Sequence, residues 1–377
     1  MKVLFITHYT GLYGANRSLL GLIDGIKNHG VKPYVLAPEE GAITEALSDR
    51  GITYYTSPFK NWVAQDRLKA PARLGMNLIM LPSLVLKVLQ WNVDLIHTNS
   101  SVTPIGALLA EVLSLPHVWH VREFGEADYN LKYDWGETLF QTFMSRAEAT
   151  IAVSEAVRCG VLSHVDSPCQ VVYNGVISTE RLGQLKQEND LRTRRDTSYT
   201  FAIVGVISPS KGQEQALRAF HQLSRENKDV HLLIAGDGGS EYVESLHELC
   251  HSLDLNQLVS FLGYVSDPFE VYLRADAVLM CSPHEAMGRV TAEAMATGRP
   301  VIGYDNAGTS ELIDDERNGL LYDGTTDDLA RCMHRLMNNP DWGYRLGEHG
   351  EKKAAQKFTN EVYAKKVYEV MCEAVGE

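Results

Sequence analysis

Two glutamates and a glycine in residues 282–301 have the types and spacing to bind a diphosphate and its neighbouring hydroxyls. Glu285 and Glu293 stand eight positions apart, the first before a predicted helix and the second inside it, and Gly288 stands where that helix begins. Backbone N–H groups at a helix start, backed by the positive end of the peptide dipoles, bind phosphate groups. Carboxylates accept hydrogen bonds from the hydroxyls of a sugar or a ribose. Together these groups predict binding of a nucleotide sugar.

The same run resembles the donor-site signature of the large retaining glycosyltransferase family 4, an E-x7-E pattern followed by a strand that begins here at Gly298-Arg299-Pro300-Val301. The resemblance covers nearly the whole chain and is strongest over residues 201–323. It implies an α/β fold of the GT-B type, with two doubly wound Rossmann-like domains facing across a cleft. It also implies a retaining hexosyltransferase that moves a sugar from a nucleotide diphosphate to a glycan or lipid-linked acceptor, in polysaccharide or glycoconjugate assembly.

Residue by residue, the resemblance implies a donor site in the second half of the chain. Glu285 would bind hydroxyls of the donor sugar, Glu293 would bind the ribose, and the backbone that follows Gly288 would hold the diphosphate. An exposed loop carboxylate is the alternative interpretation of Glu285. Residues 306–313 resemble the closing segment of the family's pattern, and Glu311 within it could equally be a charge at a helix N-terminus. The predicted donor-binding residues are Gly14, Lys211, Gly238, Tyr264, Val265, Glu285, Ala286, Met287, Gly288, Arg289, Val290 and Glu293.

Lys211 matches the family's phosphate-binding lysine, in a Lys-Gly pair that follows a strand and a glycine turn. An ammonium and the backbone donors of a helix start can both point at a diphosphate, although a Lys-Gly pair taken alone is more often a surface turn. Val206 departs from the family, because many members have arginine after the glycine of that turn. Either Lys211 works with less help, or Arg289 compensates, or activity is weak. A catalytically inactive glycan-binding or scaffolding subunit is therefore the alternative function.

Two shorter segments carry weaker signals. Gly238 lies in a glycine-rich turn after a buried strand, and any such turn can use glycine for its positive φ. Tyr264 and Val265 lie in a stretch that resembles the family segment whose backbone contacts the nucleotide base. A structural and a functional interpretation are about equal for each segment. Their order before the two-glutamate run favours the functional one.

The first half of the chain should supply the acceptor site. Gly14 lies in a loop that resembles the family's Gly-Gly-Ala loop, with Tyr13 in place of the first glycine, and would let the backbone approach the phosphates. The alternative is an ordinary strand-to-helix turn capped by Asn16 or Ser18. His120 ends an apolar strand and resembles the family histidine near the reacting sugar, although a lone histidine there is more often a satisfied core residue. The predicted catalytic residues are Glu285, Lys211 and His120.

Short apolar runs alternate with amphipathic stretches along the chain, as in repeated βα units with a mainly parallel sheet. The predicted strands are 3–7, 34–37, 95–98, 118–121, 150–153 and 170–173, then 201–206, 231–235, 259–262, 277–280, 301–303 and 320–322. Polar residues 178–198, between the two series, predict an exposed linker. The predicted domains are an acceptor-binding domain, 1–175 with a terminal helix in 360–377 assigned to it by family analogy, and a donor-binding domain, 176–359.

Charge and cysteine content narrow the function further. A formal net charge of -13 argues against broad nucleic-acid binding, which needs a surplus of Lys and Arg. The six cysteines have no metal-ligand spacing, which favours reduced thiols in a reducing compartment. No G-x-G-x-x-G follows the first strand, which argues against a dinucleotide-dependent oxidoreductase. We expect no metal, because no Asp-x-Asp motif is present, and no cofactor beyond a UDP- or GDP-linked donor.

Residues 58–90 are basic and apolar within an acidic chain, with five basic residues against one acid. Such a segment can rest on an anionic bilayer surface, which would suit a lipid-linked acceptor. The more ordinary interpretation is a core helix with a solvated edge. Asn77, Pro82 and Lys87 interrupt its longest apolar stretch, and the N-terminal strand is too short for a signal peptide. We therefore expect a cytoplasmic protein with no spanning helix, and contact of 58–90 with the inner face of the membrane is the alternative to a core helix.

Overall fold

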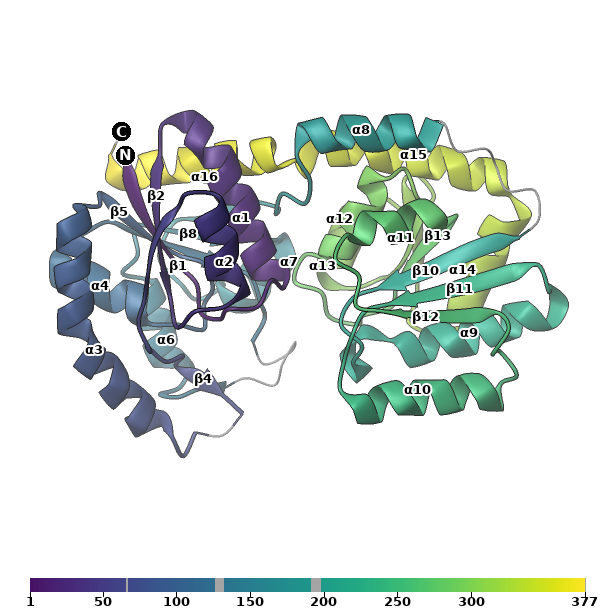
Figure 1. The fold of residues 1–377 in the computed structure, drawn as a ribbon, viewed down its shortest axis with the longest axis horizontal. Coiled ribbons are helices and arrows are strands. Elements are labelled where there is room, and N and C mark those ends of the chain that lie inside the picture. Colours follow the sequence, from purple (N-terminus) through teal and green to yellow (C-terminus); the bar gives the residue numbers. More distant parts are fainter. Residues whose placement is uncertain (66, 126–131, 191–197, 377) are drawn as a thin grey trace. The chain divides into compact units, whose positions relative to one another are not determined.

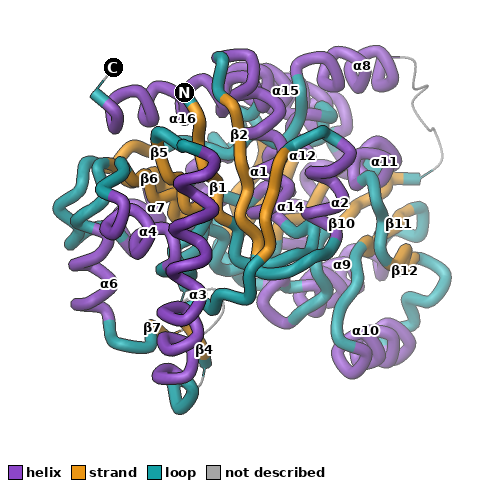
Figure 2. Tube along the Cα trace, turned by 60° about the vertical axis from the view of Figure 1, so that its left-hand side comes forward, coloured by secondary structure: helices purple, strands orange, loops and turns teal. Residues whose placement is uncertain are grey.

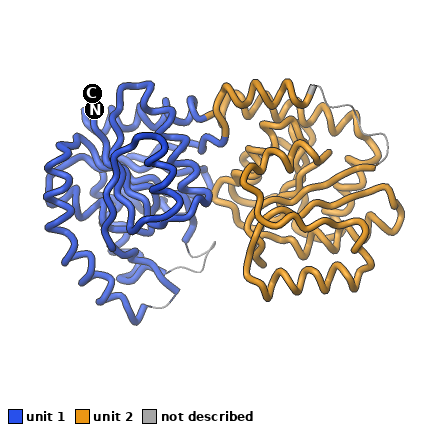
Figure 3. The backbone as a smooth tube through the Cα atoms, viewed as in Figure 1, with its two compact units in different colours: residues 1–176, 360–377 blue, residues 177–359 orange. Residues whose placement is uncertain are grey.

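The computed structural model describes residues 1–65, 67–125, 132–190 and 198–376, which form two compact units (Figures 1 and 3). Unit 1 comprises Met1–Val176 with Asn360–Glu377, and unit 2 comprises Ile177–Thr359. Each unit is a parallel sheet with helices on both faces (Figure 2). The predicted fold class, two doubly wound α/β domains, is confirmed.

Unit 1 is built on a seven-stranded parallel sheet in the order β3-β2-β1-β5-β6-β8-β9. Its strands are β1 (Lys2–Ile6), β2 (Lys32–Ala37), β3 (Thr53–Thr56), β5 (Leu95–Thr98), β6 (His117–Val121), β8 (Ala149–Ala152) and β9 (Cys169–Val171). Its helices are α1 (Gly14–Ile26), α2 (Ala42–Asp49), α3 (Ala70–Trp91), α4 (Ile105–Leu113), α6 (Glu137–Met144), α7 (Glu155–Val161) and α16 (Asn360–Val375), with a 3-10 turn at Lys27–His29. A separate antiparallel pair joins β4 (Val63–Ala64) to β7 (Lys132–Tyr133).

The alternation of side chains along β1 shows how this sheet is buried on both faces. Val3 and Phe5 enter a cluster with residues of α1 and α16, whereas Leu4 and Ile6 enter a cluster with residues of α3 and α4. Because side chains of a strand point to opposite faces in turn, an uninterrupted apolar run is the pattern of a sheet covered on both sides.

The terminal helix α16 packs into unit 1 although it follows unit 2 in the chain. Tyr363, Val367, Val370 and Met371 are fully buried in it, at the spacing of one helical face. Gly25 of α1 allows the close approach, because a Cβ there would lie 2.6 Å from the Cβ of Ala364. The predicted amphipathic tail thus completes the core of the first unit.

Unit 2 is built on a six-stranded parallel sheet in the order β12-β11-β10-β13-β14-β15. Its strands are β10 (Tyr199–Val204), β11 (Val230–Ala235), β12 (Val259–Gly263), β13 (Ala277–Met280), β14 (Val301–Tyr304) and β15 (Gly319–Tyr322). Its helices are α8 (Thr179–Asp190), α9 (Gln213–Glu226), α10 (Ser240–Ser252), α11 (Pro268–Arg274), α12 (Arg289–Ala296), α13 (Ala307–Leu312), α14 (Thr326–Asn338) and α15 (Pro340–Lys357), with a 3-10 turn at Pro209–Lys211.

The polar segment 178–198, predicted as an exposed linker, contains the helix α8 over Thr179–Asp190. Helix α8 runs beside α15 in Figures 1 and 2, and Lys186 Nζ lies 3.2 Å from Glu351 Oε1 of α15. Leu182 and Leu185 are buried. Two apolar side chains on one face are enough to dock an otherwise polar helix, and composition alone hides them. Residues 191–197 of the predicted linker lie outside the described residues.

Helix α3 contains the interrupted apolar stretch of residues 58–90 and continues through Pro82 as one helix. In the described part of the chain it is the one helix long and apolar enough to cross a membrane, by length and composition only. Of its 18-residue apolar window, 17% is buried inside the structure.

Candidate active site

The carboxyl edge of the unit 2 sheet gathers the loops that the sequence assigned to the donor. Lys211 follows β10, Gly238 follows β11, Tyr264 and Val265 follow β12, and residues 285–290 follow β13. Strands of a parallel sheet end at one edge, which is where α/β folds bind ligands. Distant sequence segments therefore meet because the strands between them are parallel.

Backbone contacts fix these loops to one another. Ile207 N donates to Asp237 O at 2.8 Å, and Gly308 N donates to Glu285 O at 2.9 Å. A Cβ on Gly308 would lie 2.5 Å from Ala286 O, so the turn after β14 rests directly on the backbone of the two-glutamate run. Glycine at 308 is required by this contact.

Lys211 and Glu285 form an ion pair at the centre of this edge. The Lys211 side chain is 30% exposed and that of Glu285 14% exposed, so both are reachable by a ligand. Gly212, with φ of 71°, lets the lysine loop pack against β13, because a Cβ there would lie 2.5 Å from Cys281 O. The structure thus places a cation suited to phosphate beside a carboxylate suited to hydroxyls.

The start of α12 forms the second part of the edge. Gly288 is its N-cap, in the left-handed region at φ of 83°, and no side chain caps the helix. Two buried hydroxyls, Thr291 Oγ1 and Thr309 Oγ1, have no hydrogen-bond partner among the described residues. They lie 3.4 and 3.7 Å from where a Cβ on Gly288 would be. Buried hydroxyls normally find partners, so both fit a bound oxyanion or sugar.

The sequence did not single out these two threonines. Thr291 lies inside the E-x7-E run, and Thr309 lies in the closing segment after β14. A hydroxyl residue three positions after a glycine N-cap was the available signal for Thr291. Nothing local marked Thr309, because only the packing of α13 on the Ala286 backbone brings it to the site.

Glu293 is buried and already holds two side chains. Its Oε2 accepts from Tyr272 Oη at 2.9 Å, and its Oε1 accepts from Arg289 Nη2 at 2.9 Å. Arg289 is therefore paired with Glu293 in this structure, and its predicted compensation for Val206 stays a prediction. The ribose role of Glu293 also stays a prediction, with the added finding that this carboxylate orients the first turn of α12.

The remaining predicted donor residues differ in exposure. Tyr264 is 67% exposed, whereas Met287 is buried. Val206, the departure from the family, is 47% exposed. Gln213 Nε2 donates to Val206 O at 3.0 Å, so the loop at this family departure is ordered by its backbone. Val290 lies in the first turn of α12, and Gly238 pairs with Ile207 through an isolated bridge.

Hydrogen bonds from the Asn16 side chain stabilise the loop before α1. Gly14 is the first residue of α1, and its N-cap Tyr13 is 64% exposed and makes no side-chain cap bond. Asn16, proposed as a possible cap, instead donates from Nδ2 to Tyr9 O at 2.9 Å and Gly11 O at 2.8 Å. Asn16 therefore does not cap α1, and Gly14 is exposed.

His120 lies at the carboxyl end of β6 in a buried polar cluster of unit 1. Arg122 Nη2 lies 3.3 Å from His120 Nδ1, and His97 Nε2 lies 3.3 Å from the same atom. A guanidinium can only donate, so Nδ1 must accept and the imidazole proton is on Nε2. His120 Nε2 is buried with no partner among the described residues. His120 therefore has its N–H group at Nε2, where it can donate a hydrogen bond to a ligand.

The histidines of this cluster are held neutral. Burial and then the positive charge of Arg122 lower the pKa of His120 and of His97 well below its usual range. The same two causes lower the pKa of His8 to about 3, and burial lowers the pKa of His117 to about 3. At neutral pH these side chains donate and accept hydrogen bonds without carrying charge.

The neighbouring Arg122 and Glu123 have separate hydrogen-bond partners. Arg122 donates from Nε to Asn99 Oδ1 at 2.9 Å and from Nη2 to Tyr363 Oη at 2.6 Å. Glu123 Oε1 accepts from Ser101 N at 2.7 Å and from Ser100 Oγ at 2.9 Å. Burial raises the pKa of Glu123.

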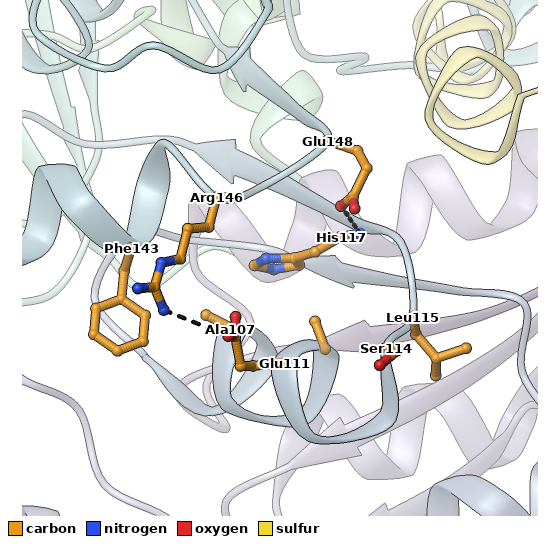
Figure 4. Close-up of a pocket in the computed structure, with 9 residues that line it drawn as sticks. Ala107, Glu111, Ser114, Leu115, His117, Phe143, Arg146 and Glu148 are labelled. Atoms are coloured by element: carbon orange, nitrogen blue, oxygen red, sulfur yellow. Dashed lines mark hydrogen bonds and ion pairs between the residues drawn. The ribbon is translucent and has the colours of Figure 1, made fainter.

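A cavity in unit 1 shares His117 with the neutral histidines and otherwise lies apart from them. It has a volume of about 320 Å³ between the end of α4 and the starts of β6 and β8 (Figure 4). Glu111, His117, Arg146 and Glu148 contribute its polar groups, and Arg146 lies 3.5 Å from Glu111. Because it sits at the amino ends of the strands, it contains no predicted site residue. Among the described residues no cluster of His, Cys, Asp or Glu could hold a metal ion.

Comparisons with known proteins identify the family. The family model Glycosyltransferase Family 4 matches residues 13–180, and Glycosyl transferases group 1 matches residues 186–353. The chain therefore belongs to glycosyltransferase family 4 and is a glycosyltransferase with the GT-B fold. No finding supports the alternative of an inactive subunit.

Relatives and solved structures agree with this assignment. An uncharacterized glycosyltransferase of Methanocaldococcus jannaschii is 29% identical over 75% of this chain and 77% of its own. The alpha-monoglucosyldiacylglycerol synthase of Streptococcus pneumoniae is 28% identical over 76% of this chain and 68% of its own. Anabaena HepE, solved in complex with UDP, superposes with a TM-score of 0.81 at 22% identity, covering 98% of this chain and 99% of that one. The last likeness shows the fold.

Proposed function

We propose that this glycosyltransferase is a retaining, metal-independent hexosyltransferase that takes its sugar from a UDP- or GDP-linked donor. The observation that carries the proposal is the carboxyl edge of unit 2, where Lys211 and Glu285 meet beside the uncapped start of α12. HepE was solved with UDP and with UDP-glucose, so UDP-glucose is the first donor to test.

In the proposed reaction the bond between the anomeric carbon and the diphosphate oxygen breaks, and the acceptor oxygen bonds to the same face of the sugar. The acceptor proton passes to the departing phosphate oxygen, so no protein base is consumed. Lys211 and the backbone N–H groups at Gly288, Arg289 and Val290 stabilise the charge that develops on the diphosphate. Glu285 orients the sugar hydroxyls, and His120 donates from Nε2 to the sugar.

We further propose a glycan or lipid-linked acceptor, cell-surface polysaccharide or glycoconjugate assembly as the process, and a cytoplasmic location with peripheral membrane contact through residues 58–90. The Streptococcus relative is named as the synthase of a glucosylated diacylglycerol, which supports a lipid acceptor. The apolar exposure of α3 supports the membrane contact.

Thermal-shift screening with UDP-, GDP- and ADP-sugars tests the donor, because a ligand that binds only the folded state raises the melting temperature by mass action. We expect one nucleotide series to stabilise the chain, and the stabilising donor to lose its sugar to water or to an acceptor. Nucleotide binding without turnover across a donor and acceptor screen would instead favour the inactive subunit. Absence of any nucleotide effect would reject the proposed site.

A further inference from the structure

The outward side of α3 carries apolar side chains where the helix of a water-soluble domain normally carries polar ones. Leu78 is 52% exposed, Ile79 69%, Leu86 63% and Leu89 59%. At 3.6 residues per turn these positions share one side of the helix. The apolar face consists of Leu74, Leu78, Ile79, Pro82, Leu86 and Leu89.

The two charged residues of α3 are both turned away from the apolar face. Arg73 Nε donates to Asp134 Oδ2 at 2.8 Å. Lys87 Nζ lies 5.2 Å from the ring centroids of Tyr55 and Trp91. The face is therefore free of charge along the whole length of the helix.

The opposite side of α3 is fixed to unit 1. Leu84 and Val88 are buried in the core cluster, and the Asn77 side chain bonds both backbone polar groups of Lys60, at 2.6 and 2.9 Å. In Figures 1 and 2 the helix lies along the edge of the unit with β4 near its first turns. A spanning helix must be surrounded by lipid, so α3 can meet a bilayer only lengthwise.

Cations gather at the N-terminal end of α3. Lys60, Arg67 and Lys69 are exposed, and Lys132 on β7 is exposed beside them through the pairing of β7 with β4. Glu137, at the start of α6, is an exposed acid in this region; Asp66 lies outside the described residues. The basic end is defined as Lys60, Arg67, Lys69 and Lys132.

An exposed tryptophan adjoins the basic end. Trp135 is 46% exposed and directly follows Asp134, the partner of Arg73. Tryptophan is enriched where apolar and headgroup layers meet, because its ring is apolar and its N–H is polar. An apolar face, a cationic end and an adjoining tryptophan are the components of a helix that lies in a membrane interface.

We propose that the apolar face and the basic end together dock on an anionic phospholipid surface, with α3 lying in the plane of the interface and Trp135 at headgroup level. Lipid phosphates complement the positive charge of the basic end, whereas a second copy of this chain would bring the same cations. The proposal deepens the proposed function by assigning the lipid-facing surface and its headgroup charge. It rests on that function only for the nature of the acceptor.

Cosedimentation of the full chain with vesicles tests the proposal. We expect binding to vesicles of phosphatidylcholine with phosphatidylglycerol, much weaker binding to phosphatidylcholine alone, and release by alkaline carbonate. L78Q/L86Q should lower the partition coefficient at least about tenfold. R67Q/K69Q should lower it about fivefold per charge on anionic vesicles only. Tyr344→Gln is the matched control, because Tyr344 is 44% exposed on α15 of unit 2.

Equal binding of L78Q/L86Q and the parent chain would overturn the proposal, as would equal binding to both vesicle types. Light scattering measures the oligomeric state and so tests whether a second copy of the chain covers the apolar face. A dimer that L78Q/L86Q converts to monomer, with no vesicle binding by either form, would also overturn the proposal. Vesicle binding is measured without donor, so its failure leaves nucleotide-dependent melting and sugar transfer as independent tests of the proposed function.

Discussion

The cations near the strand ends have acidic partners in unit 2 and uncharged partners in unit 1. In unit 2, Lys211 pairs with Glu285 and Arg289 pairs with Glu293. In unit 1, every described hydrogen-bond partner of the buried Arg122 is uncharged. These partners are Asn99, Asn174, His120 and Tyr363.

The difference means that the charged groups of unit 2 can exchange their partners for a ligand, whereas the hydrogen bonds of Arg122 in unit 1 are already formed. An ion pair such as Lys211 with Glu285 can open to receive a phosphate and a hydroxyl, because each charge gains a new partner. A buried guanidinium with neutral partners raises the cost of any further positive charge nearby. In unit 1, burial and Arg122 therefore keep His8, His97 and His120 neutral. In unit 2, each charge of the Lys211–Glu285 pair can exchange its partner for a group of the ligand.

Lowering the pH should destabilise unit 1 more than unit 2, and this is the largest effect that we expect. The native pKa of His8 and His117 is about 3, and those of His97 and His120 also lie well below the ordinary value of 6.5. Below about pH 6.5 these histidines bind protons in the unfolded chain but stay unprotonated in the native state. Stability is therefore lost as pH falls from 6.5 toward 3, by up to about 1.4 kcal/mol per histidine per pH unit.

Hydrogen exchange measured at pH 7 and at pH 5.5, corrected for intrinsic rates, would locate this loss. Peptides of β5, β6 and β8 should lose protection, and peptides of β10 and β13 should lose less. Equal losses in both units would show that Arg122 and burial do not set the difference.

Lys211→Met tests the exchangeable pair of unit 2. We expect transfer to fall about 10²- to 10³-fold, as when one stabilising donor is removed from a developing anion. The rate of sugar transfer at saturating donor is the measurement, with the melting temperature as a check on folding.

Lys186→Met is the control for Lys211, because Lys186 also pairs with a glutamate of unit 2 but lies on α8. It should leave transfer within about twofold of the parent. An undiminished rate for Lys211→Met would remove this lysine from the mechanism.

Arg122→Gln tests whether Arg122 keeps His120 neutral. Without the guanidinium, the pKa of His120 should rise and its Nδ1 could carry the proton. We expect the parent enzyme to keep a constant rate of transfer from pH 8 to pH 6, whereas the variant loses about tenfold and falls further with acid.

Arg122→Lys and Tyr363→Phe separate charge from structure. Lysine keeps the positive charge and should restore part of the constant profile. Tyr363→Phe removes one partner of Arg122 but leaves the contact with His120, so its profile should match the parent. A flat profile for folded Arg122→Gln would show that Arg122 does not control His120.

Ala307→Gly should have the smallest effect. Ala307 has φ of 49°, and the left-handed region strains any residue with a Cβ. We expect a gain of up to about 1 kcal/mol in unfolding free energy, reduced by the entropy of glycine. Denaturant unfolding measures it, and a loss of stability would show that the Ala307 methyl group contributes packing that outweighs the strain.

Local sequence signals predicted much of the fold. The twelve predicted strands all occur, within two residues of their expected ends, because uninterrupted apolar runs between turns are the pattern of a buried parallel sheet. The four-residue β3 and the β4–β7 pair were missed. Short, half-exposed strands lack that pattern, and their pairing partners are remote in the sequence.

Longer-range packing explains the remaining differences. Helix α8 was predicted as a linker because its two buried leucines stand among charges. Pro82, which interrupts the apolar stretch of 58–90 in the sequence, lies inside the continuous helix α3, whose other side packs in the core. The donor-site positions were predicted from the E-x7-E run, whereas Thr309 could not be, because its place at Gly288 depends on how α13 packs.

The sequence by itself determined the alternation of strands and helices, the family, and which residue types stand at the strand ends. Only the tertiary structure decided which of those residues meet. It paired Lys211 with Glu285 across 74 positions, and it joined Arg122 to Tyr363 across 241 positions. Charge pairing and tautomer choice depend on distances between side chains, and parallel strand order sets those distances without leaving any mark in the local sequence.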